Sequence, residues 1–158
     1  PRSTLFPYTT LFRSMTAVTE RWIGGMLTNV TTTNAQIKKL KDLERRMASG
    51  DLEKRYNKLE VQRYQEEIDS LNQKYGGIKS MNGRPGLVVV LDMLTDKNAI
   101  AEAKNLGIPV VAVADTNADP SKVEYPIPGN DDAIKGLQLL LDYFVAAINE
   151  GKAKKEEN

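Results

Sequence analysis

Two apolar, valine-rich runs, residues 87–91 and 110–114, constrain the fold of this chain more than any other feature. Neither run alternates apolar with polar residues, and such continuous runs are typical of strands buried on both faces of a parallel sheet. The stretch between them has apolar residues at helical spacing, namely Ala99, Ile100, Ala103 and Leu106. Gly107 comes next, where a helix is expected to end. The pattern predicts an α/β fold built on two parallel strands and a crossover helix.

The rest of the sequence adds little to this sheet. Residues 123–127 form a short candidate for a third strand, and the prolines at positions 126 and 128 favour an edge position for it. A sheet of this size leaves open edges and cannot bury both faces of its strands. We therefore expect an incomplete parallel sheet whose first strands lie outside this sequence.

Composition excludes several kinds of chemistry. The 158 residues include no cysteine and no histidine, so disulfides, thiol nucleophiles, imidazole bases and Cys/His zinc sites are excluded. No apolar run is long enough to cross a bilayer. Residues 15–86 carry an excess of four lysines and arginines, whereas residues 87–158 carry an excess of five acidic residues. A polyanion is therefore expected to prefer the first half.

The first fourteen residues share no pattern with the rest of the chain. Residues 1–14 back-translate without a gap into a string that resembles a widely used DNA-sequencing adapter. We predict that this segment is a disordered sequencing artefact, the alternative being a genuine N-terminal arm. The protein proper is then expected to begin upstream of Met15.

Two helices with narrow apolar stripes are predicted between residues 31 and 76. The stripe of the first helix, 31–49, comprises Ile37, Leu40, Leu43 and Met47. The stripe of the second has heptad spacing and comprises Val61, Tyr64, Ile68, Leu71 and Tyr75. A break at residues 49–51 predicts an antiparallel coiled-coil hairpin. Its basic residues either bind phosphates or form a solvated face, and a self-associating coiled-coil module acting through residues 61–75 is a further hypothesis.

A last helix is predicted from the apolar residues Ile134, Leu137, Leu141, Phe144, Val145 and Ile148. We expect Asn130 to be its N-cap and Gly151 to end it. Residues 152–158 are then a short charged tail. Earlier in the chain, Arg21 and Trp22 can stack on a nucleobase, although packing of Trp22 into the core is the simpler interpretation.

Two aspartates lie directly after the two predicted strands. Asp92 and Asp115 would lie at the carboxyl ends of these strands, where open α/β sheets place ligand sites. With Asp131 and Asp132 nearby, they suggest an α/β ligand-binding domain or a Mg²⁺-dependent phosphoacceptor domain. Neither strand leads into a glycine-rich phosphate loop, and no set of acid, base and nucleophile accompanies the aspartates. We therefore favour the interpretation that they end strands and accept loop N–H groups.

Several short segments, taken together, resemble the family of bacterial small-subunit ribosomal protein S-two. They include residues 19–22 (TERW), 24–29 (GGMLTN), 76–78 (GGI) and the strand that ends at Asp92, and then 103–109 (AKNLGIP), 114–120 (ADTNADP) and 127–134 (IPGNDDAI). They occur in the family's order across residues 15–151, and the combined set is highly specific. The hairpin tip at 50–58 and the loop at 82–86 depart from the family pattern.

The resemblance implies a Rossmann-like or flavodoxin-like three-layer α/β domain with an inserted coiled-coil hairpin. Residues 15–30 and 77–151 would belong to the α/β domain, which is N-terminally truncated here, and residues 31–76 to the hairpin. It also implies a structural, non-enzymatic role in the small ribosomal subunit in the cytoplasm. The implied partners are small-subunit ribosomal RNA, neighbouring ribosomal proteins and, in many bacteria, ribosomal protein S-one. No catalytic residue, cofactor, metal, small-molecule substrate or membrane is expected.

On this basis, we expect recognition of RNA shape and phosphates rather than of base sequence. The candidate RNA-binding residues are Arg21, Trp22, Lys38, Lys39, Lys41, Arg45 and Arg46. The acidic second half is expected to face protein or solvent.

Overall fold

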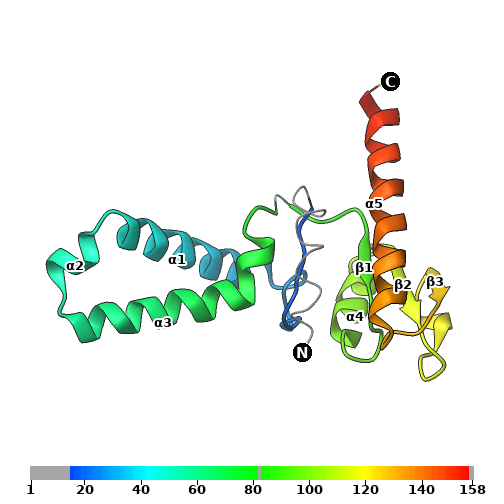
Figure 1. Cartoon of the computed structure of the whole chain (residues 1–158), viewed down its shortest axis with the longest axis horizontal. Coiled ribbons are helices and arrows are strands. Elements are labelled where there is room, and N and C mark those ends of the chain that lie inside the picture. The colour runs from blue at the N-terminus through cyan, green and yellow to red at the C-terminus, as the bar shows by residue number, and fades with distance from the viewer. Residues whose placement is uncertain (1–14, 82, 157–158) are drawn as a thin grey trace. The chain divides into compact units, whose positions relative to one another are not determined.

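The structure, a computed structural model, describes residues 15–81 and 83–156. The segment predicted to be adapter-derived, 1–14, lies outside the described residues. The chain divides into two compact units (Figure 1). Among the described residues, the hairpin unit spans 18–84, and the sheet unit comprises residues 85–156 together with 15–17.

The hairpin unit contains two long helices, α1 (Val30–Ala48) and α3 (Lys58–Tyr75), which lie side by side (Figure 1). Their shared core consists of Leu40, Leu43, Ile68 and Leu71, with Met47, Tyr64 and Tyr75 packed against it. These are residues of the two predicted stripes. The stripe of α3 therefore packs within the chain, so the hypothesis that it mediates self-association has no exposed stripe to act through.

A short helix at the hairpin tip, α2 (Asp51–Arg55), was not predicted. Gly50 starts it in the left-handed region, with φ of 68°. Leu52 is fully buried, and the Arg46 Nε and Arg55 Nε atoms lie 3.4 and 2.8 Å from carboxylate oxygens of Asp51. A five-residue helix has almost no stability of its own, so these contacts hold it in place.

The segment before α1 packs against the base of the hairpin. Met26, Ile37 and Ile78 form a buried cluster, and Trp22 and Ile23 are among the half-buried side chains around it. The unit is continued after α3 by a 3₁₀ turn, η2 (Gly76–Ile78). The sequence assigned residues 15–30 to the α/β domain, but from Val18 onward they group with the hairpin unit because of this cluster.

The sheet unit contains three parallel strands in the order β1 (Val88–Val90), β2 (Val110–Ala114) and β3 (Tyr125–Pro128). Helix α4 (Lys97–Asn105) connects the first two and contacts both, and a 3₁₀ turn, η3 (Pro120–Lys122), precedes the third. Gly107 lies just after α4 with φ of 68°, a left-handed conformation in which glycine is least strained. The predicted α/β class, the parallel pairing and the edge position of the proline-rich strand are confirmed.

Within the described residues the first strand is not buried on both faces, which agrees with the expectation for a sheet of this size. Val90 is buried, but Val89 is 40% exposed and Leu87, just before the strand, is 45% exposed. Val89 lies in one row with Val111 and Tyr125 across the three strands. Among the described residues nothing buries this row completely, since Tyr125 is also exposed.

The last helix, α5 (Ile134–Glu156), starts and ends later than predicted. The Asn130 Oδ1 atom accepts hydrogen bonds from the N–H groups of Asp132 and Ala133, so Asn130 forms a turn before the helix rather than its N-cap. Gly151 does not end the helix, which continues into the predicted tail. In residues 15–81 and 83–156, no helix combines the length and apolar character needed to span a membrane.

Candidate nucleic-acid interface

The outward face of α1 carries a line of cationic side chains. Lys38, Lys41 and Arg45 are spaced by three and four residues, which places them on one side of the helix. All three are exposed, and the buried residues of α1, such as Leu40 and Leu43, lie on other sides. We call these three residues the α1 stripe. Neighbours at this spacing are about 5–6 Å apart at Cβ, so the stripe can contact several phosphates of one RNA backbone.

Two of the predicted cations are held by carboxylates of the hairpin itself. The Lys39 Nζ atom pairs with Glu67 of α3. Arg46 pairs with Asp51, and its pKa is raised by hydrogen bonding with Tyr56 and by the nearby Asp51 carboxylate. The Arg46 contact joins α1 to the tip, whereas the Lys39–Glu67 pair between α1 and α3 is exposed at the surface and adds little stability.

The α1 stripe is less constrained. Lys38 and Lys41 form no ion pair with any residue in the described part of the chain. Arg45 pairs with Asp42 on its own helix, but its side chain is 78% exposed and this contact competes with water. A polyanion can therefore bind the α1 stripe without breaking strong ion pairs within the chain.

The two remaining predicted residues, Arg21 and Trp22, differ in their exposure to solvent. Arg21 is exposed, whereas Trp22 is half-buried and packs around the cluster of Met26, Ile37 and Ile78. The simpler interpretation of Trp22, packing into the core, agrees with this position. Stacking of its ring on a nucleobase has no support from the structure.

Charge distinguishes the two long helices. The residues of α1 carry an excess of three cations, whereas those of α3 carry an excess of one acid. On the polar face of α3, Glu66 accepts a hydrogen bond from Gln62, and Asp69 accepts one from Gln65. Helix α1 therefore forms the cationic side of the hairpin.

A polar contact that the sequence did not reveal holds the hairpin base. The Glu44 carboxylate accepts hydrogen bonds from Asn72 Nδ2 at 2.9 Å and from Lys79 Nζ at 2.7 Å. The Lys79 bond is the main cause that lowers the pKa of Glu44. Three segments far apart in sequence meet here, so no local pattern signals the contact.

The strand-end aspartates accept hydrogen bonds from their own loops. Asp92 Oδ1 accepts from the N–H groups of Leu94 and Thr95 at 3.0 and 2.8 Å. Asp115 Oδ1 accepts from Thr116 N–H at 2.6 Å, and this bond is the main cause that lowers the pKa of Asp115. The favoured interpretation, in which these residues end strands and bind loop N–H groups, agrees with this geometry.

Asp131 is close to both of them. Desolvation, together with the smaller effect of the nearby Asp92 charge, raises the pKa of Asp131, and its N–H group donates to Asp115 Oδ2 at 3.4 Å. Within residues 15–81 and 83–156, no group of three or more acidic residues has the arrangement needed to hold a metal ion. The hypothesis of a Mg²⁺-dependent phosphoacceptor or ligand-binding domain is not favoured.

Comparison with known proteins points to one family. The family described as Ribosomal protein S2 matches residues 10–151, a range that includes the last five residues of the predicted adapter segment. The small ribosomal subunit protein uS2 of Pseudoalteromonas atlantica is 48% identical over 140 residues, which cover 89% of this chain and 57% of that protein. The uS2 proteins of a Synechococcus species and of Bifidobacterium longum are 47% and 46% identical, and the matches cover 58% and 49% of their lengths.

A three-stranded parallel sheet and a cationic helical hairpin in one chain define an α/β protein with an arm suited to a polyanion. The matches make the assignment more specific: the chain belongs to the ribosomal protein S2 family, as its motifs indicated. The chain spans about half the length of the curated relatives it matches.

Proposed function

We propose that this chain is a structural, non-catalytic part of the small ribosomal subunit and binds small-subunit ribosomal RNA through the α1 stripe. The observation that carries this proposal is the exposed, i, i+3, i+7 line of Lys38, Lys41 and Arg45 on the more cationic helix. Arg21 adds a further exposed cation in the same unit. Phosphate contacts of this kind supply affinity without reading base sequence.

Some of the predicted cations have carboxylate partners within the hairpin and others do not, and this narrows the set of residues expected to bind RNA. Lys39 and Arg46 already have carboxylate partners within the hairpin, Glu67 and Asp51, so they are less available to RNA than the α1 stripe. Family membership supports neighbouring small-subunit ribosomal proteins as further partners. Ribosomal protein S-one as one of these partners, and the cytoplasm as the location, are part of the proposal. The acidic sheet unit is then expected to face protein or solvent.

Binding to a transcript of small-subunit ribosomal RNA tests the proposal. We expect the triple variant Lys38→Gln, Lys41→Gln, Arg45→Gln to bind at least tenfold more weakly. The slope of log affinity against log salt concentration should fall by about 0.7–0.9 for each phosphate contact removed. Filter binding at several salt concentrations measures both quantities.

The matched control removes the same charge from α3. Lys58, Arg63 and Lys74 are exposed and form no ion pair with another described residue. Their triple glutamine variant should retain most of the affinity and of the salt dependence. An equal loss in both variants would mean that RNA binds the hairpin without preference for a face, and the assignment to the α1 stripe would be abandoned.

A further inference from the structure

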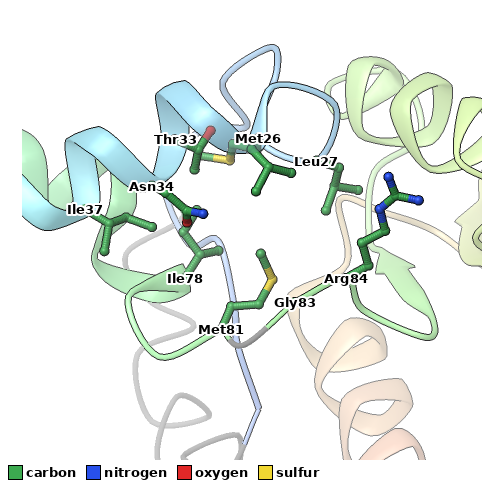
Figure 2. Close-up of a pocket in the computed structure, with 10 residues that line it drawn as sticks. Met26, Leu27, Thr33, Asn34, Ile37, Ile78, Met81, Gly83 and Arg84 are labelled. Atoms are coloured by element: carbon green, nitrogen blue, oxygen red, sulfur yellow. The ribbon is translucent and has the colours of Figure 1, made fainter.

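A cavity of about 80 Å³, lined by both apolar and polar side chains, lies at the base of the hairpin unit (Figure 2). Its walls come from the two segments that enter and leave the hairpin. Met26, Leu27, Val30 and Ile37 line it from the entering segment and α1, and Ile78 and Met81 line it from the segment after α3. Figure 2 shows the lining side chains around an open centre. An occupant would therefore contact both ends of the hairpin at once.

The volume limits what can enter. An engineered protein cavity of about 150 Å³ accepts benzene. The present cavity has about half that volume, so we expect it to take a group smaller than an aromatic ring. A branched aliphatic side chain is smaller, and the flexible thioethers of Met26 and Met81 can adjust around it.

The exposed polar side chains of Asn34 and Arg84 also line the cavity. Neither side chain forms a hydrogen bond or an ion pair with another residue in the described part of the chain. The Arg84 guanidinium turns outward from the centre in Figure 2. A cation beside apolar side chains complements a carboxylate placed next to an aliphatic side chain.

We propose that this cavity receives an aliphatic side chain of a partner protein, with Arg84 pairing with an adjacent carboxylate of that partner. Asn34 has donor and acceptor groups for the partner's backbone. An aliphatic or aromatic side chain anchored in a pocket is one way to form the centre of a binding interface. The contact is independent of RNA binding and is tested separately from it.

Methyl NMR of the full chain tests the proposal, because the chain has five methionines and two of them line the cavity. The probe is N-acetyl-leucyl-aspartyl amide, titrated into protein labelled with ¹³C at the methionine methyl groups. We expect saturable shifts at Met26 and Met81, with Met47 and Met93 unchanged. The lysyl analogue, N-acetyl-leucyl-lysyl amide, should bind about threefold more weakly, as expected for an exposed ion pair.

Two variants and their control identify the contacts. Arg84→Gln should remove the preference for the aspartyl probe without affecting the leucine-dependent shifts. Val30→Phe places a ring at the cavity and should abolish the shifts, whereas Leu59→Phe, at an exposed site on α3, should not.

Three outcomes would overturn the proposal. These are no shift at Met26 and Met81, equal shifts at all observed methyl groups, or a stronger response to uridine monophosphate than to the leucyl-aspartyl probe. The last outcome would make the cavity a nucleotide site. None of them depends on whether the α1 stripe binds ribosomal RNA, so failure here leaves the proposed function untouched.

Discussion

Glu44 shows at the residue scale how the hairpin base depends on charge. Its carboxylate is bound by Asn72 and Lys79, and its side chain is 31% exposed. We expect Glu44→Gln to lower the free energy of unfolding by about 1 kcal/mol at pH 7, because it removes a charged hydrogen bond at a partly buried site. Urea unfolding measures this value. Glu66→Gln is the matched control on the polar face of α3 and should change it by less than about 0.5 kcal/mol.

The same contact predicts a pH dependence. The folded-state pKa of Glu44 lies below its ordinary value of 4.5, so the contact stabilises the fold fully above about pH 4.5. This contribution is lost as the pH falls through the lower folded-state pKa. The difference in unfolding free energy between the natural chain and Glu44→Gln should therefore shrink below pH 4.5. A difference that stays constant down to about pH 3 would show that the charge of Glu44 does not stabilise the base.

The cations of α1 show why site residues were only partly predictable. Spacing alone places Lys38, Lys41 and Arg45 on one face, and this can be worked out from the sequence. The pairing of Lys39 with Glu67 joins positions 28 residues apart, and no local pattern reveals it. The sequence therefore identified the cationic helix but could not separate the unpaired charges from those with a carboxylate partner within the hairpin.

At the scale of elements, the long periodic segments were the most predictable. The apolar spacing in α1, α3 and α4 and the valine runs of β1 and β2 determine their types. Helix α2 was missed because five residues show no period, and its conformation depends on burial of Leu52. The end of α5 was misplaced because one glycine, Gly151, weakens a helix without having to end it.

A substitution at Leu52 tests whether burial of this side chain stabilises helix α2. We expect Leu52→Ala to destabilise the chain by about 2–5 kcal/mol, as is usual for truncation of a fully buried leucine. The effect should be concentrated at the tip, since α2 has little stability without this contact. Hydrogen exchange should become faster in residues 51–57 and stay unchanged in Lys97–Asn105 of the sheet unit. Uniformly faster exchange in both units would contradict a local role for Leu52.

At the scale of the whole molecule, the charge difference between the two halves matches the division into units. The excess of cations lies in residues 15–86 and the excess of acids in 87–158, which is close to the boundary at Arg84 and Pro85. The sequence alone predicted this difference in net charge, because charged residues can be counted without knowing the fold. The grouping of Trp22 and Ile23 with the hairpin was not predictable, since it depends on contacts with Ile37 and Ile78.

Lysine footprinting of the full chain tests this division directly. Bound to small-subunit ribosomal RNA, the chain should show protection of Lys38 and Lys41 from acetylation, because both ammonium groups would face phosphates. The exposed lysines of the sheet unit, Lys97, Lys104, Lys122 and Lys135, should react as they do in the free chain. Mass spectrometry of the acetylated peptides measures each site, and Lys58 on α3 is the internal control within the hairpin unit. If the sheet-unit lysines were protected as strongly as Lys38 and Lys41, RNA would contact both units. The prediction that RNA binds only the cationic unit would then be wrong.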